Sequence, residues 1–237
     1  YAMVIINAIR SRPNDLAQIQ LHIEHLLQEA KQEREIELTR KKQKRQRNKQ
    51  EIMLPVEEFE TAEEESAHLR TQNVLIRLGK ITGCSVFVAP NDKSRLFHGK
   101  PLGEECLKHL PNLGLSEEAT RRISLIDIIW IKQNAPICAF EVEATTSIYS
   151  GLLRMSDLLS LVPALNVKLY IIAPKNRQER VRTELTRPTF KRIGLNDFCK
   201  FIPMEELGKL LSQVEGLSGH VQPTIVDTVA IEFEEEI

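Results

Sequence analysis

The sequence predicts an α/β domain with a mixed sheet flanked by helices, preceded by an N-terminal helical arm. Two apolar segments, 124–132 and 136–144, are joined by a short connection, and this pattern predicts an antiparallel hairpin. A helical pattern then leads to another apolar segment, 168–173, which predicts a crossover to a further strand. We therefore expect two parts: an arm with a charged linker over residues 1–62, and a compact domain over residues 63–237.

The arm begins as an amphipathic helix and continues as a charged segment. Ser11, Pro13 and Asn14 are typical of a helix start. Apolar residues then recur at helical spacing: Ile19, Ile23, Leu26, Leu27 and Ala30. The run RKKQKRQRNK at 40–49 is basic, and residues 57–65 are acidic. The basic run fits contact with phosphates and a solvated helix or tether equally well.

The elements of the compact domain follow from apolar periodicity and from turn residues. Helices are predicted over 67–80, 147–161, 176–186 and 204–211, and strands over 84–89, 124–132, 136–144, 168–173 and 198–202. Gly83 ends the first helix, and residues 90–92 form a turn. Residues 93–120 predict loop and a short helix. A hairpin followed by a helical crossover predicts helices on both faces of the sheet.

Composition excludes several classes of protein. The chain has 237 residues, is 42% hydrophobic and carries a net charge of −1, so any affinity for nucleic acid depends on local charge. Its cysteines form no C-x-x-C pair, which argues against structural zinc. With no secretory signal and no bilayer-length apolar run, we expect a cytoplasmic protein with reduced thiols and no membrane partner. The chain begins at Tyr1, so we expect a fragment or processed form and leave a missing upstream domain open.

Three carboxylates lie in the predicted hairpin. Asp127 stands in the first strand among isoleucines and a tryptophan, and Glu141 and Glu143 stand in the second. Side chains alternate faces along a strand, so the two glutamates project from one face. A buried carboxylate is costly unless it is paired or binds a metal. Each acid alone is explained by a strand end facing water or by a hydrogen bond to the backbone, but the three together predict a divalent-cation site.

The order of elements and these acids resemble the core of the PD-(D/E)XK nuclease superfamily, which has the restriction-endonuclease-like fold. Asp127 matches the first acid of the family pattern, and the segment EVE at 141–143 matches the acid-x-Lys element on the next strand. The resemblance covers about residues 64–205. The segment FEVEATTSIYSGLLRMSDLL also resembles a group of bacterial proteins predicted to be nucleases of this superfamily.

The sequence departs from the family pattern at Ile126, where many members have Pro, and at Glu143, where Lys is usual. Some restriction enzymes of the superfamily carry Glu there and are active, so the change bears on the general base. The resemblance implies Mg²⁺ or Mn²⁺ held by Asp127, Glu141 and the backbone carbonyl of Val142. It implies that Glu143 binds a second ion or orients the attacking water molecule. It also implies that the metal ion makes this water more acidic.

The resemblance also implies a helper from the first helix, for which Gln72 is the candidate and Glu65 the alternative. The alternative for both is a polar, exposed helix face, and this face is what we expect for His68. Hydroxyl-bearing residues follow the second strand, where they cap a helix or contact a phosphate: Thr145, Thr146, Ser147 and Tyr149.

A basic segment after the third apolar strand is the predicted nucleic-acid surface. Its cationic residues are Lys175, Arg177, Arg180, Arg182, Arg187, Lys191 and Arg192. They would follow a phosphate backbone, or they form an ordinary solvated helix with ion pairs. Arg154, in the preceding helix, would reach nucleic acid or the acidic site, or pair with Asp157.

The function predicted first is a metal-dependent nuclease, acting on DNA; its setting in bacterial defence is implied by the resemblance alone. The alternatives are an inactive nucleic-acid-binding module of the same fold, and an interaction protein in which the arm makes a coiled dimer. A homodimer is left open, because two copies would make double-strand cutting easier.

Overall fold

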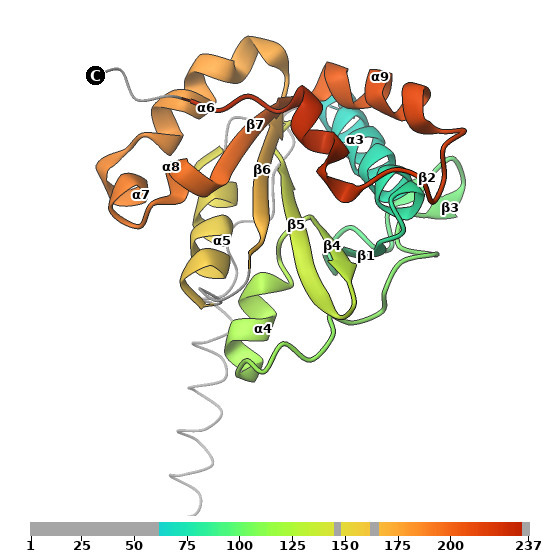
Figure 1. Cartoon of the computed structure of the whole chain (residues 1–237), viewed down its shortest axis with the longest axis horizontal. Helices are drawn as coiled ribbons and strands as arrows, with labels where there is room; N and C mark the ends of the chain where they lie inside the picture. The colour runs from blue at the N-terminus through green and yellow to red at the C-terminus, as the bar shows by residue number, and fades with distance from the viewer. Residues whose placement is uncertain (1–61, 145–147, 162–165, 234–237) are drawn as a thin grey trace, which may run out of the picture. The chain divides into compact units, whose positions relative to one another are not determined.

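The computed structural model describes residues 62–144, 148–161 and 166–233, which belong to the compact unit Pro55–Ile237. A five-stranded mixed sheet lies at the centre, with strand order β1-β4-β5-β6-β7 (Figure 1). Its strands are β1 (Ser85–Val88), β4 (Ile128–Lys132), β5 (Ala135–Val142), β6 (Lys168–Ala173) and β7 (Cys199–Pro203). The β1/β4 and β4/β5 pairs are antiparallel, and the β5/β6 and β6/β7 pairs are parallel.

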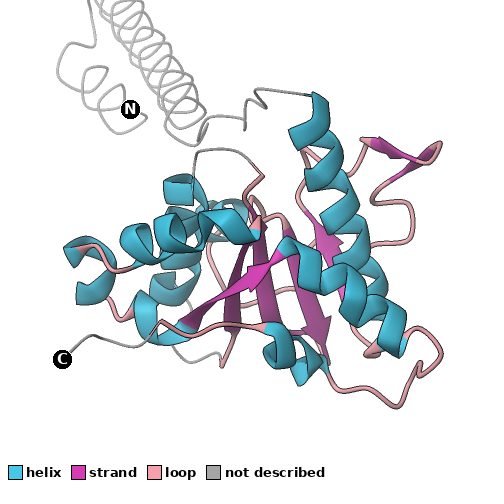
Figure 2. Ribbon diagram, turned by 90° about the horizontal axis from the view of Figure 1, so that it is seen from above, coloured by secondary structure: helices cyan, strands magenta, loops and turns pink. Residues whose placement is uncertain are grey.

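Helices cover both faces of the sheet (Figure 2). One face packs against α3 (Ala62–Ile81), α9 (Met204–Val214) and the 3₁₀ helix η2 (Pro223–Val229). The other packs against α4 (Glu117–Ile123), α5 (Ile148–Leu161), α6 (Gln178–Leu185), α7 (Pro188–Arg192) and α8 (Leu195–Phe198). Each face has its own apolar core, so the predicted α/β class with a mixed, helix-flanked sheet is confirmed.

The β4–β5 hairpin has the predicted antiparallel pairing. Gln133 and Asn134 have φ of 51° and 64°, as in the two-residue hairpin turns that match strand twist. The first strand begins at Ile128 and not at residue 124, because the chain continues in turns after α4: the backbone N–H of Ile126 donates to the carbonyl of Ile123 at 3.1 Å. This turn leaves Asp127 directly before the strand.

The α3 helix lies close against β4. Nε1 of Trp130 donates to the carbonyl of Leu75 at 3.1 Å, and a Cβ at Gly79 would lie 2.7 Å from that nitrogen. A glycine is therefore required at position 79 for the helix to reach this depth. The approach brings the N-terminal half of α3 to the end of the sheet where Asp127 lies.

The structure differs from the predicted elements in two segments. Residues 93–120 also contain a small hairpin of β2 (Leu96–Phe97) and β3 (Lys100–Pro101), and the predicted helix 176–186 divides into the 3₁₀ helix η1 (Lys175–Arg177) and α6. The arm and its basic run lie outside the described residues, and the predicted domain boundary stays a prediction.

The four cysteines are free thiols, and burial raises the pKa of Cys138 to about 12. No described helix is long and apolar enough to cross a membrane.

Candidate metal-binding and catalytic site

The three predicted acids meet at one end of the sheet. Glu141 lies near the carboxyl end of β5, Glu143 follows that strand, and Asp127 precedes β4, the antiparallel neighbour. The side chains are deeply buried: Asp127 is 5% exposed, and both glutamates are 0% exposed. The three acids of the predicted hairpin are therefore buried, while their role as a cation site stays a prediction.

Glu141 and Glu143 lie on one face of the sheet, as their two-residue spacing predicts, and α5 packs on that face. The residues between and beside them, Phe140 and Val142, belong to the core under α3 and α9. A Cβ placed on Gly151 of α5 would lie 2.2 Å from Oε1 of Glu143 and 3.2 Å from Cβ of Glu141. The helix thus packs directly on both glutamates at a position without a side chain.

Arg154 of α5 makes a bidentate ion pair with Glu141. Its Nε donates to Oε1 at 2.7 Å and its Nη2 donates to Oε2 at 2.6 Å, while Glu143 Oε1 lies 4.0 Å from Nη2. Burial lowers the pKa of Arg154, but the charges of Glu141, Asp127 and Glu143 outweigh burial and raise it above its ordinary value. The guanidinium therefore stays charged in a closed, acidic environment.

Of the three roles weighed for Arg154, the structure shows contact with the acidic site. Arg154 is 6% exposed, so its predicted contact with nucleic acid would require separation from Glu141. The pairing with Asp157 is wrong, because the carboxylate of Asp157 lies 3.5 Å from Arg122 of α4.

Asp127 connects three segments through its backbone and its side chain. Its Oδ2 accepts from the backbone N–H of Val142 at 2.8 Å, and its carbonyl accepts from the backbone N–H of Ala89 at 3.0 Å. The N–H of Asp92 in turn donates to the carbonyl of Ala89 at 3.0 Å. The turn after β1 is thereby fixed beside the acid that precedes β4.

A second group of polar side chains, from α3 and this turn, adjoins Asp127. His68, Asp92 and Asp127 each offer one ligand atom, and these atoms lie within 4.8 Å of one another. Nε2 of His68 lies 3.7 Å from Oδ2 of Asp92, and Nε2 of Gln72 donates to the same oxygen at 2.7 Å. The expected exposed face for His68 is wrong: His68 and Gln72 continue the buried stripe of α3.

Electrostatics favour the ionised form of Asp92. Burial raises its pKa, but contacts with His68, Gln72 and Arg95 outweigh burial and hold the pKa below its ordinary value. Nε of Arg95 lies 3.3 Å from Oδ1, and Arg95 also lies 3.5 Å from Glu65, the alternative helper of the sequence analysis. Asp92 was predicted only as part of a turn; its place beside Asp127 follows from the pairing of Val88 with Ile128, which the sequence alone does not supply.

The residues present fit a divalent cation. Carboxylate and imidazole groups are ligands for such ions, and buried acids are retained at lower cost when a cation compensates them. The structure brings Asp127, Glu141, Val142, Glu143 and Gln72 to one end of the sheet. Their roles as ligands or catalytic groups stay predictions, as does the carbonyl of Val142 as a ligand. Thr145, Thr146 and Ser147 lie outside the described residues.

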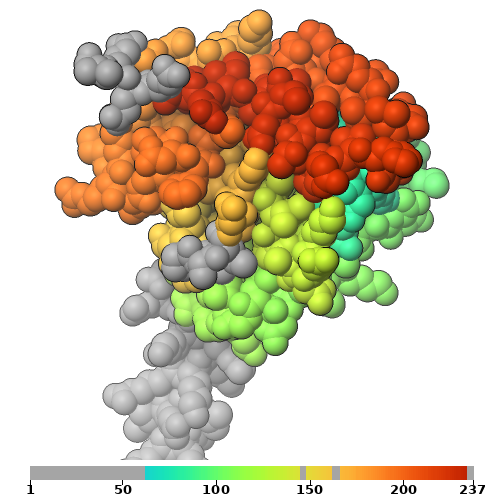
Figure 3. Space-filling view, viewed as in Figure 1, coloured from blue at the N-terminus to red at the C-terminus, as the bar shows by residue number. Residues whose placement is uncertain are grey.

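The predicted nucleic-acid surface begins at the same end of the sheet. β6 runs parallel to β5, the N–H of Glu143 donates to the carbonyl of Ile172 at 2.7 Å, and Lys175 follows directly after β6. The segment from α6 to α8 forms one flank of the face in Figure 3, where it is orange. Exposed cationic residues on η1, α6 and α7 are Lys175, Arg180, Arg187, Lys191 and Arg192.

Several of the predicted cationic residues also make local contacts, and Arg182 lies 3.9 Å from Glu179. Arg177 lies 3.5 Å from Glu64, one turn before His68 in α3. Arg187 lies 2.8 Å from Glu184, and its guanidinium stands 5.5 Å from the ring centroid of Tyr149. Ion pairs thus occur, as the alternative for this segment predicts, while binding of nucleic acid by it stays a prediction.

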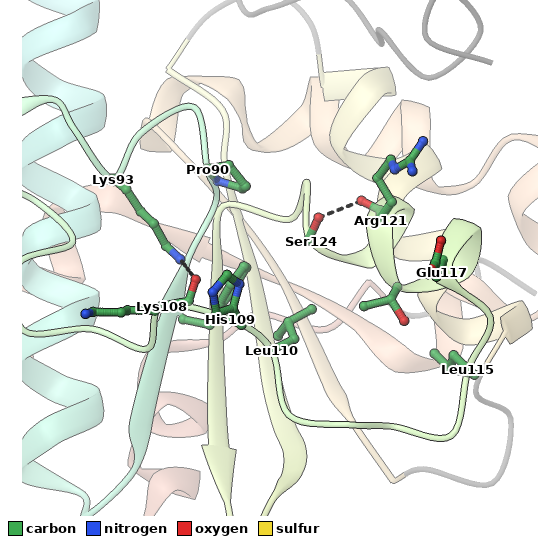
Figure 4. Close-up of a pocket in the computed structure, with 11 residues that line it drawn as sticks. Pro90, Lys93, Lys108, His109, Leu110, Leu115, Glu117, Arg121 and Ser124 are labelled. Atoms are coloured by element: carbon green, nitrogen blue, oxygen red, sulfur yellow. Dashed lines mark hydrogen bonds between the residues drawn. The ribbon is translucent and has the colours of Figure 1, made fainter. Parts of the chain in front are cut away.

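A cavity of about 410 Å³ adjoins the turn that carries Asp92 (Figure 4). Pro90 and Lys93, which flank Asp92, are among its lining residues, together with Lys108 and Arg121. Nζ of Lys93 donates to the carbonyl of Lys108 at 2.7 Å, so the ammonium group of Lys93 links two residues of the cavity wall. None of the predicted catalytic or metal-binding residues lines this cavity.

The mixed five-stranded sheet with helices on both faces has the architecture of a restriction-endonuclease-like fold. The family of the C-terminal domain of type II restriction enzyme NmeDI matches residues 50–232, and the chain belongs to this family. The type II restriction enzyme NmeDI of Neisseria meningitidis serogroup C is 29% identical over 155 residues, which cover 60% of this chain and 42% of that protein. The chain thus matches less than half of that enzyme's length. No solved structure matches the chain.

Proposed function

We propose that the chain is a metal-dependent nuclease that hydrolyses phosphodiester bonds of DNA in a restriction-type role, with Mg²⁺ or Mn²⁺. The observation that carries the proposal is the meeting of Asp127, Glu141 and Glu143, all buried, at one end of the sheet in a member of a restriction-enzyme family. A fold needs no such cluster for packing, because buried acids are costly. A nuclease would explain why the buried acids are present, since the reaction requires a cation at the phosphate and the acids would bind that cation.

The relative's name supports the same proposal. NmeDI is a type II restriction enzyme, and the matching family is its C-terminal domain. Extending its class of activity to this chain is part of our proposal, because the alignment spans 42% of that protein. The PD-(D/E)XK assignment, a homodimer and a cytoplasmic location are proposed on the same footing.

The reaction adds water across one P–O bond, so that one product ends in a phosphate and the other in a hydroxyl group. A divalent cation, when bound, makes a water molecule more acidic and offsets negative charge on the phosphate. Asp127 would hold the cation, together with the backbone carbonyl of Val142. Glu141 is the second predicted ligand, and it would be available to a cation only if Arg154 gave up its bidentate pair.

The remaining side chains orient the reactants. Glu143 lies next to Glu141 against α5, where its carboxylate would accept a proton from the attacking water or align it. Gln72 donates to Asp92 and so positions an acid beside Asp127. The cationic residues of η1, α6 and α7 lead the DNA backbone toward this end of the sheet.

The proposal is tested by cleavage of supercoiled plasmid with the full 237-residue chain, in Mg²⁺ and in Mn²⁺. We expect Asp127→Asn and Glu141→Gln to lower the rate by roughly 10²-fold or more, as loss of transition-state charge stabilisation does. Asp157→Asn is the matched control, because this acid lies on α5 but pairs with Arg122. Cleavage that survives in the Asp127→Asn/Glu141→Gln double variant would contradict the assignment.

The second candidate is a module that binds DNA without cleaving it. Arg154 favours this function, because its bidentate pair with Glu141 already compensates an acid that catalysis would need. Glu143 in the position of the family's usual Lys favours it as well. Retained DNA binding with no cleavage in either ion, by wild type and variants alike, would support this candidate.

A further inference from the structure

We propose that His68, Asp92 and Asp127 form a binding site for a divalent transition-metal ion such as Mn²⁺. The inference deepens the proposed function, on which it rests for the presence of a cation at Asp127, and it assigns the ligands differently. The candidate ligand atoms lie within 4.8 Å of one another, and all three side chains are buried. Two ligands on opposite sides of an ion at about 2.1–2.3 Å are roughly 4.2–4.6 Å apart, so only a small inward shift would let ligand atoms within 4.8 Å share one ion.

The backbone holds these ligands in place. Asp92 and Asp127 are linked through Ala89, whose N–H donates to Asp127 and whose carbonyl accepts from Asp92, each at 3.0 Å. His68 lies on α3, which packs against β4 through the bond between Trp130 and Leu75. Three separate segments therefore deliver one ligand each, and little reorganisation is needed to bind an ion.

Gln72 provides an independent indication of a ligand. Its side chain is 0% exposed, and its Nε2 donates to Asp92 at 2.7 Å. Because the carboxylate accepts, the amide nitrogen must face Asp92, and Oε1 is left without a hydrogen-bond partner among the described residues. A buried amide oxygen without a donor is unfavourable, and a cation, or a water that a cation orients, would satisfy it.

Glu141 differs from these ligands in its charge balance. Both of its oxygens accept from the buried guanidinium of Arg154, so a cation must displace an internal partner to reach it. Asp92 is held differently: its Oδ1 lies 3.3 Å from Arg95 Nε and its Oδ2 lies 3.7 Å from His68 Nε2, so its two oxygens contact two different residues and not one bidentate guanidinium. We therefore infer that an added ion binds the His68 cluster while Glu141 stays with Arg154.

The imidazole determines which ion is preferred. Mg²⁺ and Ca²⁺ favour oxygen ligands, whereas imidazole nitrogen suits first-row transition metals. Two carboxylates with one imidazole therefore favour Mn²⁺ over Mg²⁺. The neutral imidazole is the binding form, so binding of Mn²⁺ releases any proton that His68 carries.

The test measures Mn²⁺ binding to the full chain directly, by electron paramagnetic resonance of free Mn²⁺, and indirectly by thermal melting with MnCl₂ or MgCl₂. We expect Mn²⁺ to raise the melting temperature of the wild type more than Mg²⁺ does. His68→Gln and Asp92→Asn should weaken Mn²⁺ binding by about tenfold or more and lose the melting shift. Titration below the melting temperature of each variant keeps the comparison valid if a variant is less stable.

Two matched controls carry the same chemical changes outside the cluster. His109→Gln alters an exposed histidine, and Asp157→Asn alters the acid paired with Arg122. Both should bind Mn²⁺ as the wild type does. Unchanged binding in His68→Gln and Asp92→Asn, loss of binding in Glu141→Gln alone, or no Mn²⁺ binding by the wild type would overturn the inference.

These outcomes separate the inference from the proposed function. If Mn²⁺ binding depends on His68 and Asp92 but no plasmid is cleaved, the ligand assignment stands and the nuclease proposal fails. If plasmid is cleaved while both variants bind Mn²⁺ normally, the nuclease proposal stands and the ligand assignment fails.

Discussion

Gly151 lies so close to Glu143 that a Cβ at position 151 would stand 2.2 Å from Oε1. Any residue other than glycine at position 151 would therefore clash with Glu143 unless α5 moved away from β5. The same missing side chain places the helix against Glu141 and lets Arg154, three residues further along α5, reach that carboxylate. The contact between helix and strand thus sets the geometry of the acidic site.

Gly151→Ala should therefore destabilise the fold and disturb the acidic site. Glycine within a helix is ordinarily about 0.5–1 kcal/mol worse than alanine, but overpacking costs about 1–3 kcal/mol. Chemical denaturation should show a net loss of stability. Gly208→Ala in α9, where a Cβ meets nothing within 4 Å, should raise stability and serves as the control. Equal stabilisation by both changes would contradict the close packing.

The Arg154–Glu141 pair should show strong coupling in a double-mutant cycle. Arg154→Met leaves a wholly buried carboxylate without its bidentate partner, and breaking a buried pair in this way costs about 3–5 kcal/mol. Glu141→Gln should also destabilise, and the double variant should lose much less than the sum of the two. The measurement is urea unfolding of the four proteins; additive losses would argue against the pair.

Asp227 should make the stability depend on pH near the acid end. Burial raises its pKa, but Lys168, Tyr170 and Lys200 outweigh burial and lower the pKa below the ordinary 3.8. A lowered pKa in the folded state means that the stabilising contribution is present above the ordinary pKa and is lost as pH falls through the folded value. Asp227→Asn should thus be less stable than the wild type at pH 7, and the difference should shrink below about pH 4. A constant difference across this range would refute the linkage.

The cationic residues of α6 and α7 should determine how DNA binding depends on salt. Each lost phosphate contact lowers the slope of log K against log salt by about 0.9 for duplex DNA. Replacement of the exposed Arg180 and Arg192 by glutamate should weaken binding and reduce the slope, as measured by fluorescence anisotropy over a salt series. Lys209→Glu, on α9, is the matched charge control. Equal slopes in all variants would place the DNA elsewhere.

Local sequence patterns predicted the hairpin well, and they predicted the faces of its acids. Alternation along β5 depends on adjacent residues only, so the common face of Glu141 and Glu143 could be inferred. The strand 168–173 was predicted with the bounds that β6 has, because a continuous apolar run marks a buried parallel strand.

The α3 side of the site could not be predicted, because it depends on long-range packing. His68 precedes Asp127 by nearly sixty residues, and their proximity follows from the depth at which α3 lies on Trp130. Asp92 reaches the site only through the pairing of β1 with β4. Arg154 was weighed for three partners, and its choice of Glu141 depends on the missing side chain at Gly151, a detail of packing and not of spacing.

Asp127 connects neighbouring segments of the chain as well as being a candidate ligand. Its carbonyl accepts a hydrogen bond from Ala89, and its carboxylate accepts one from Val142. Removing the side chain would leave the N–H of Val142 without this acceptor and weaken the contact between the start of β4 and the end of β5. Loss of cleavage in such a variant would therefore not distinguish a lost metal ligand from a displaced hairpin. An isosteric amide at this position keeps an acceptor for that N–H and alters only the charge. The carboxylate proposed as a metal ligand is thus also the group that ties the residue before β4 to the end of β5.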